Sequence, residues 1–206
     1  MPAMTTAKST ARTDAKTRQI LQAARTILAR RGYAGTTVSL VAAEAGVSRG
    51  LLHYYFKNKE AMLARVIDEN MAASVILVED LLARSRNATE IADQLVEALQ
   101  QLFKFDPDFF SLFFEAEAAA RQSSALEAQL QTLYGNFRRA VQKGLQAAID
   151  RGDIAPPIPA TGLSAILTSI IDGLGLQFIT ETDLVDDRQI WDAAHKSICL
   201  LLGEKV

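Results

Sequence analysis

Residues 36–60 read TTVSLVAAEAGVSRGLLHYYFKNKE, and this stretch decides the fold of the N-terminal part of the chain. Its pattern predicts two short helices, over residues 37–45 and 48–55, separated by Gly46. Glycine suits a tight turn because it adopts a positive φ without steric cost, and Ala42 is small enough to lie where the helices touch. The apolar side chains at inward positions of such a unit are Val41, Ala45, Val47, Leu52 and Tyr55. The segment from about residue 37 to 56 therefore predicts a helix-turn-helix.

The second of these helices would present its outward side chains to the major groove of DNA. Ser48 can cap the helix, Arg49 can donate two hydrogen bonds to one guanine, and Gly50 permits close approach to the duplex. Leu51 can contact a thymine methyl group, whereas Tyr54 suits either a phosphate contact or simple exposure. The predicted DNA-binding residues are Thr37, Ser48, Arg49, Gly50, Leu51, His53, Tyr54 and Lys59, with Thr37 and Lys59 directed at phosphates.

The charge of the chain is divided unevenly between its two parts. Residues 1–60 contain ten Lys or Arg and three Asp or Glu, whereas residues 61–206 contain twelve and twenty-one, and the whole chain carries −2. A basic segment attracts an anionic duplex, and an acidic one is repelled by it. We therefore predict a flexible basic arm over residues 1–12, a DNA-binding domain over residues 13–60, and a ligand-binding and dimerisation domain over residues 61–206.

The remaining sequence shows helical periodicity, with no alternating strand pattern and no Asn-Gly or Asp-Gly hairpin turn. We expect an all-α fold of about nine helices, in a small N-terminal trio and a larger C-terminal bundle. The first helix should run from residue 14 to 31, with Thr13 or Asp14 as its cap and Gly32 at its end. Seven apolar residues of the last two helices form the predicted dimer interface: Leu163, Ile166, Ile170, Leu174, Ile190, Ala194 and Ile198.

Six of the nine phenylalanines lie between Phe103 and Phe114. Core packing explains part of this group, but two adjacent pairs cover so broad a helix face that some rings should line a cavity or a subunit contact. The candidate ligand-binding residues are Phe103, Phe110, Phe113, Phe114, Glu117, Tyr134, Phe137 and Asp172. Glu115 and Glu117 are either cavity groups for a cationic ligand or, the favoured interpretation, solvated helix-face charge. Trp191 and His195 share a face of the last helix, where core or dimer packing is favoured over ligand binding.

Several functional classes find no support in the sequence. One cysteine, Cys199, and two distant histidines make a zinc cage or histidine metal site unexpected, and no glycine-rich phosphate loop or nucleophile–base pair is recognisable. We expect no enzyme activity, no metal and no cofactor. The first residues lack an apolar signal core, and Asp172 interrupts the apolar stretch 163–180, so we expect a cytoplasmic protein. The alternative function is a helical small-molecule carrier or enzyme without a DNA role.

The segment from residue 14 to 66 resembles the TetR family of transcriptional regulators. The residues that carry this resemblance are Ile20-Leu21, Ile27, Gly32-Tyr33, Thr36-Thr37-Val38, Ala42 to Val47, Leu52, Tyr55-Phe56 and Lys59-Glu60. The C-terminal part resembles the BetI-like branch, through Glu115 to Arg121, Asp150 to Ile154, Ile171 to Leu174, and Trp191. The resemblance implies an all-helical homodimer that a small molecule releases from a near-palindromic operator, and repression is the commoner behaviour in the family. Many members have tyrosine at the position of His53, so the phosphate contact implied there passes to His53 or Tyr54.

Overall fold

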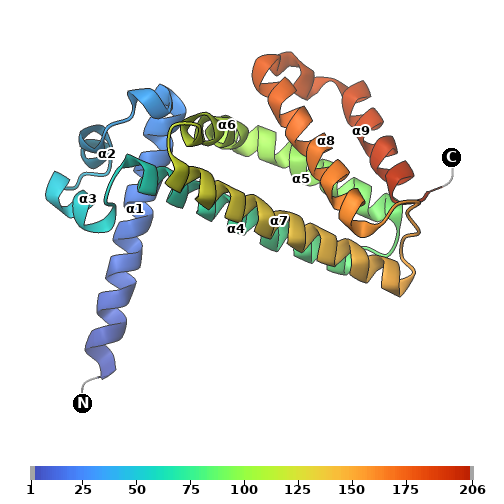
Figure 1. The fold of residues 1–206 in the computed structure, drawn as a ribbon, viewed down its shortest axis with the longest axis horizontal. Helices are drawn as coiled ribbons and strands as arrows, with labels where there is room; N and C mark the ends of the chain where they lie inside the picture. Colours follow the sequence, from blue (N-terminus) through green and yellow to red (C-terminus); the bar gives the residue numbers. More distant parts are fainter. Residues whose placement is uncertain (1–2, 205–206) are drawn as a thin grey trace. The chain divides into compact units, whose positions relative to one another are not determined.

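The structure, a computed structural model, describes residues 3–204, with side chains from Ala15 onward. Within this range the chain forms nine α-helices and one short 3-10 helix and contains no strand (Figure 1). The predicted all-α fold of about nine helices is confirmed. The helices are α1 (Ala3–Gly35), α2 (Val38–Glu44), α3 (Arg49–Tyr55), α4 (Lys59–Arg84), α5 (Ala88–Phe105), α6 (Asp108–Ala120), α7 (Ser124–Arg151), α8 (Ala160–Thr180), η1 (Thr182–Asp186) and α9 (Arg188–Leu201).

The chain divides into two compact units. Unit 1 comprises Met1–Glu69 and Leu112–Leu130, and unit 2 comprises Asn70–Ser111 and Gln131–Val206. Helices α4, α6 and α7 therefore each contribute residues to both units.

Unit 1 is built on α1, which packs against α2, while α2 packs against α3. Ile20 and Leu28 of α1, Val41 of α2 and Leu52 of α3 are almost completely buried. Helices as short as α2 and α3 are marginal in isolation, so this shared apolar core is what holds them in place.

The start of α1 differs from the prediction. The helix begins at Ala3 rather than at residue 14, so neither Thr13 nor Asp14 is its cap, and the backbone from Ala3 is helical where a flexible arm is predicted. The first two residues of that arm lie outside the described residues. The physical reason is that no glycine or proline interrupts residues 3–31, so nothing in the chain ends the helix. The predicted end is confirmed in kind, because Gly32 adopts φ +65° and kinks the helix.

Unit 2 has an aromatic core. Phe103 of α5 stacks on Phe110 of α6 with ring centroids 5.1 Å apart, and it meets Phe178 of α8 edge-on at 4.8 Å. Trp191 of α9 lies 5.1 Å from Phe178, and its Nε1–H donates to Val185 O at 2.7 Å. The core-packing interpretation is thus confirmed for Phe103 and Phe110, which are both buried.

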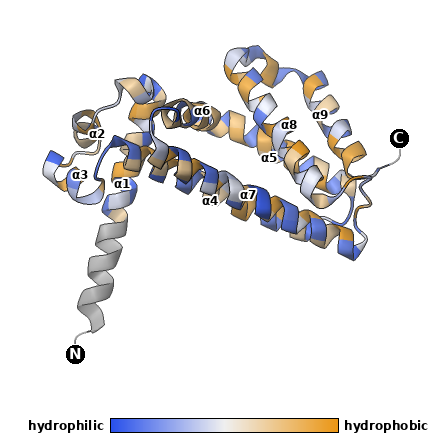
Figure 2. Ribbon diagram, viewed as in Figure 1, coloured by the Kyte–Doolittle hydropathy of each residue, from blue (hydrophilic) through white to orange (hydrophobic). Residues whose placement is uncertain are grey.

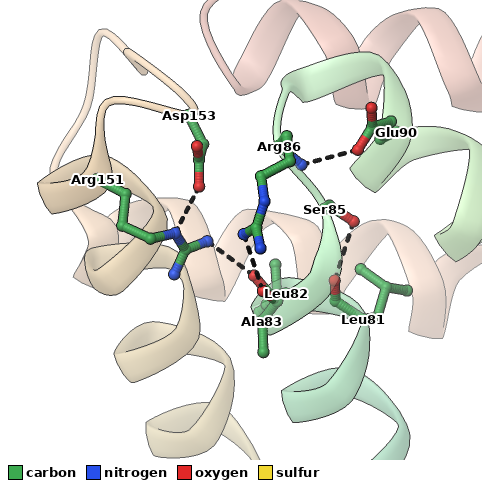
Figure 3. A network of polar contacts seen from close by, with 8 residues as sticks. All are labelled: Leu81, Leu82, Ala83, Ser85, Arg86, Glu90, Arg151 and Asp153. Atoms are coloured by element: carbon green, nitrogen blue, oxygen red, sulfur yellow. Dashed lines mark hydrogen bonds and ion pairs between the residues drawn. The ribbon is translucent and has the colours of Figure 1, made fainter.

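The C-terminal end of α4 is held by a polar network within unit 2 (Figure 3). Arg151, from the end of α7, donates to Leu82 O at 3.0 Å and pairs with Asp153. Ser85 Oγ donates to Leu81 O at 2.9 Å, and Arg86 Nη1 donates to Ala83 O at 3.1 Å. The two arginines satisfy the carbonyl groups of Leu82 and Ala83 in the last turn, whereas Leu81 O also accepts the Ser85 N–H at 3.1 Å.

The coloured helices carry both apolar and polar residues, as expected of amphipathic helices with one face toward a core (Figure 2). Helix α8 is the most apolar in composition and is long enough to cross a membrane by length and hydropathy alone, yet only 28% of its most apolar window is buried. Ile166 and Leu176 of this helix are 46% and 52% exposed. The expectation that α8 is a buried helix therefore holds for one of its faces. The opposite face is exposed in the single chain.

Candidate nucleic-acid interface

The turn between α2 and α3 has the geometry that the sequence predicts. Gly46 adopts φ +60°, and Val47 N donates to Ala42 O at 2.9 Å to close the turn. Each helix is capped by the hydroxyl oxygen of the residue before it: Thr37 accepts from Leu40 N at 3.3 Å, and Ser48 accepts from Leu51 N at 3.2 Å. A hydroxyl that accepts in this way keeps its own proton, so both residues can still donate to a phosphate oxygen.

The outward face of α3 is polar, basic and open. Ser48, Arg49, Gly50 and His53 are exposed, as is Thr37 at the start of α2. Tyr54 is 81% exposed and meets Tyr55 edge-on, with ring centroids 5.4 Å apart. Helix α3 contains no acidic residue, so nothing on it repels a phosphate backbone.

Leu51 and Lys59 stand apart from the other predicted DNA-binding residues because both are half-buried. The Lys59 ammonium donates to Tyr33 O at 2.8 Å and lies 3.9 Å from the centre of the Tyr33 ring. An ammonium group carries three protons, so this contact leaves two for a phosphate. Lys59 therefore links α4 to the end of α1 in addition to any contact it makes with DNA.

Tyr33 is the centre of a polar network that the sequence does not reveal. Its hydroxyl donates to Glu60 Oε1 at 2.7 Å, and its backbone N–H donates to Glu115 Oε2 at 2.7 Å. Burial and the bond to Glu60 together raise the pKa of Tyr33 to about 12, and the same bond lowers the pKa of the Glu60 carboxyl. Glu115 thus caps the kink of α1, and it is neither the solvated charge nor the cavity group that the sequence suggests.

A small apolar pocket lies inside unit 2. Its volume is about 30 Å³, which is the space of a few atoms. Helices α4, α5, α7 and α8 supply its lining: Val78, Leu81, Leu82, Ile91, Leu95, Phe137, Val141, Leu145, Leu167, Thr168 and Ile171. The Thr168 hydroxyl donates its proton to Ser164 O at 2.8 Å, so a ligand in the pocket would meet a lining that is almost entirely hydrocarbon.

The candidate ligand-binding residues are scattered through the structure. Phe137 lines the pocket, whereas Phe103 and Phe110 belong to the aromatic core of unit 2. Three of the remaining candidates lie in unit 1: Phe113 is buried, Phe114 is half-buried and Glu117 is exposed. Tyr134 and Asp172 are half-buried in unit 2 and do not line the pocket. The aliphatic lining from α4, α5 and α8 is what sequence analysis misses, because an apolar helix stripe looks the same whether it faces a core or a pocket.

The predicted dimer interface requires a correction. Leu163, Ala194 and Ile198 are buried within their own chain, so they leave no surface for a partner. Ile166 is exposed, and Ile170, Leu174 and Ile190 are half-buried. The error has a simple physical cause, since α8 and α9 have apolar residues on two faces and sequence alone does not say which face meets the chain's own core.

His195 and Cys199 lie on the side of α9 that faces α5. His195 Nε2 is 2.9 Å from Asp93 Oδ1, at the edge of an open groove of about 880 Å³ between α5, η1 and α9. Cys199 is buried, and burial is the main cause that raises its thiol pKa to about 12. A thiol with so high a pKa stays protonated at neutral pH and is a poor nucleophile.

Two family profiles match the chain. The profile of bacterial regulatory proteins of the tetR family matches residues 20–66, and the C-terminal profile of BetI-type transcriptional repressors matches residues 88–203. The HTH-type transcriptional repressor AcnR of Corynebacterium glutamicum is 25% identical over 158 residues, which cover 75% of this chain and 77% of that protein. The fatty acid metabolism regulator protein of Bacillus subtilis is 28% identical over 135 residues, covering 61% of this chain and 68% of that protein.

Solved structures share the same fold. The transcriptional regulator FadR from Bacillus subtilis, crystallised in complex with stearoyl-CoA, aligns with a TM-score of 0.74 at 21% identity, over 92% of this chain and 99% of that chain. The match extends beyond the helix-turn-helix to almost the whole described chain.

Proposed function

The chain belongs to the TetR family of transcriptional regulators, with a BetI-type C-terminal region, and we propose that it is a repressor that an apolar small molecule releases from its operator. In this proposal residues 13–60 bind DNA, residues 1–12 add basic charge beside the duplex, and residues 61–206 bind the effector and the second subunit. Repression is supported by the BetI-type profile and by the similarity to the repressor AcnR.

The observation that carries the proposal is the outward face of α3. Its N-terminal residues Ser48, Arg49 and Gly50 are exposed and lie on a helix without acidic side chains. A helix that enters the major groove with its N-terminal end leading contacts base edges with these residues. Arg49 is placed to donate two hydrogen bonds to a guanine, and Leu51 offers an apolar contact beside it.

The dimer uses the uncovered face of α8 and α9. The exposed side chains on this face include Ile166, Leu176 and Leu200, interspersed with small residues such as Ala165 and Ala193. Burying large apolar side chains of this kind stabilises an interface by roughly 1.5–3 kcal/mol for each one covered. A two-fold dimer presents two α3 helices about 34 Å apart, so the operator should be near-palindromic.

The effector is an apolar or amphipathic molecule that enters the pocket of unit 2. Its lining is hydrocarbon, and a structural neighbour was crystallised with stearoyl-CoA, a ligand with a long acyl chain. A volume of about 30 Å³ is too small for such a chain, so binding requires the lining side chains to move apart. A ligand that binds only the opened state shifts the protein toward that state in proportion to its differential affinity.

We further propose that the protein is not an enzyme and that it acts in the cytoplasm, where bacterial DNA lies. The relatives reported above are regulators, and the described surface of α3 is suited to DNA rather than to catalysis. A carrier of the same fold would bind the apolar molecule without binding DNA, and the experiment below separates the two functions.

The test is a titration of the purified dimer against a fluorescent DNA fragment taken from upstream of its own gene. We expect Arg49→Ala to weaken specific binding by about 1–3 kcal/mol, since it removes a bidentate contact. Arg84→Ala is the matched control, because Arg84 is an exposed arginine of unit 2 paired with Asp80. Equal affinity of both variants and the wild type for specific and random DNA would reject the proposal.

A further inference from the structure

His53 lies on the same face of α3 as Arg49. The two residues are four positions apart, so they are separated by about one helical turn, roughly 6 Å along the helix axis. Both are exposed. Gly50, three positions before His53, carries no side chain, and a Cβ built there would meet no atom within 4 Å. The imidazole of His53 is therefore open on the side that faces the start of the helix, and it can approach a duplex together with Arg49.

The position of His53 along α3 indicates which part of a duplex it meets. A recognition helix enters the major groove with its N-terminal end leading, and the residues at that end contact base edges. His53 belongs to the last turn of α3, away from the leading end. Side chains at the trailing end of such a helix reach the phosphate backbone at the edge of the groove. The group that faces His53 in a complex is therefore a phosphate oxygen.

The helices around His53 contribute little negative charge. Helix α2 packs against α3, and its one charged residue, Glu44, lies beside the turn at the opposite end of α3 from His53. On α3 itself the other charged or titratable side chains are Arg49, Tyr54 and Tyr55, so this helix has no carboxylate. Neither helix therefore places a carboxylate beside the imidazole along the chain.

The segments before and after the helix-turn-helix are basic or have their charges engaged. After α3 come Lys57, Lys59 and Glu60. The Lys59 ammonium donates to Tyr33 O, and the Glu60 carboxylate accepts the Tyr33 hydroxyl proton. Helix α1, which packs against α2, has five Lys or Arg and no acidic residue between residues 15 and 35. A bound duplex thus brings the negative charge that an imidazolium on α3 would meet.

We propose that His53 makes the DNA affinity of this protein depend on pH, with tighter binding as the pH falls. A neutral imidazole donates one hydrogen bond and keeps a lone pair on its second ring nitrogen, whereas an imidazolium donates from both nitrogens and carries a positive charge. Histidine changes charge between pH 5 and 8. A phosphate binds the imidazolium more tightly, so DNA binding is coupled to the uptake of up to one proton by His53. The inference rests on the proposed function, because it needs the DNA-binding surface of α3.

The test is a titration of the purified protein against the fluorescent fragment from upstream of its own gene, from about pH 5.5 to about pH 8 at constant ionic strength. We expect the wild type to bind about threefold to tenfold more tightly at the acidic end, because it gains one charge-assisted hydrogen bond to a phosphate. The slope of log affinity against log salt concentration should also steepen by up to about 0.9, because one more phosphate is neutralised.

Three variants locate the effect. His53→Gln keeps a hydrogen-bond donor that does not titrate, so its affinity should not change with pH and should match that of the wild type near pH 8. His53→Lys is charged throughout this range, so its affinity should be equally flat but as tight as that of the acidic wild type. His195→Gln is the matched control and should keep the wild-type dependence, because His195 is the other histidine of the chain and lies in unit 2 beside Asp93. Since His53 is exposed, its substitutions leave the core of unit 1 intact.

A pH dependence that persists in His53→Gln would overturn the proposal, and so would its loss in His195→Gln alone. Nuclear magnetic resonance of the His53 ring gives a direct measurement of the proton. A titration midpoint at higher pH in the DNA complex than in the free protein supports the proposal, and an unchanged midpoint overturns it. If the wild type binds the fragment at no pH, the proposed function itself is rejected, whereas binding without pH dependence rejects only the role of His53.

Discussion

The helix-turn-helix of unit 1 and the pocket region of unit 2 are both helical, but they use their surfaces in opposite ways. Helix α3 buries one large side chain, Leu52, and exposes a polar face that includes Arg49 and Tyr54. Helix α8 buries Leu163 and Leu167 and exposes Ile166 and Leu176, which are apolar. A surface for DNA must keep its charge in water until a phosphate replaces the water, whereas an apolar surface in water marks a place that a partner covers.

The largest effect is expected from removing the core that supports the polar face of α3. Leu52→Ala deletes a side chain that is completely buried and should lower the free energy of unfolding by about 2–5 kcal/mol. Denaturant titration followed by circular dichroism measures this loss. Leu77→Ala is the control, because Leu77 is 51% exposed on α4 and its loss should cost well under 1 kcal/mol. Similar losses in the two variants would contradict the assignment of Leu52 to the core.

A second prediction addresses the apolar face of unit 2. Ile166→Asp places a charge at the centre of the proposed dimer surface and should weaken dimerisation at least about tenfold, the equivalent of roughly 1.4 kcal/mol. Analytical ultracentrifugation over a range of concentrations measures the monomer–dimer equilibrium. Ile76→Asp is the matched control, since Ile76 is 68% exposed on α4. An unchanged dimer in Ile166→Asp, or equal disruption by both, would place the interface elsewhere.

The two glycines of the helix-turn-helix differ in backbone conformation. A Cβ at either position meets no atom within 4 Å, but only Gly46 has a positive φ. Gly46→Ala should therefore destabilise the protein by about 1–2 kcal/mol through backbone strain alone. Gly50→Ala, inside α3, should stabilise it by up to about 1 kcal/mol while weakening DNA binding, because the backbone approaches the duplex there. Thermal unfolding and DNA titration of both variants test this, and stabilisation by Gly46→Ala would count against the turn geometry.

The smallest predicted effect is a pH dependence from the Tyr33–Glu60 pair. The pKa of Tyr33 is raised to about 12, so its contribution to stability is complete below its unfolded pKa near 10 and is lost as pH rises toward 12. The pKa of Glu60 is lowered, so its contribution is present above its unfolded pKa near 4.3 and is lost as pH falls. Tyr33→Phe should flatten both limbs of the stability profile. Identical profiles for wild type and variant would show that the bond does not form in solution.

The parts of the fold that depend on neighbours in sequence could be predicted. The turn at Gly46 and the caps at Thr37 and Ser48 follow from local rules for φ and for helix N-termini, and the structure shows each of them. The start of α1 was the exception among local features. A segment without glycine, proline or a strong apolar stripe carries too weak a signal to separate a helix from an arm.

The parts of the candidate sites that depend on distant pairs could not be predicted. Phe137 and Phe103 both lie on amphipathic helices, yet one lines the pocket and the other stacks in the aromatic core. Lys59 is basic and near the motif, but its ammonium is turned onto Tyr33, a residue 26 positions earlier. Both outcomes depend on which helices pack together, and periodicity states only that a helix has an apolar face.

The all-α class, the helix-turn-helix and the positive charge near the N-terminal end of the chain all follow from the linear sequence. Each of these rests on residue type or on interactions within about four residues, which are already present in the linear order. The tertiary structure alone decided that Glu115 meets the Tyr33 N–H across 82 residues, and that Ile166 rather than Leu163 faces outward. The physical reason is that packing selects one face of each helix from several that are nearly equal in hydrophobicity, and that choice is made by the whole fold at once.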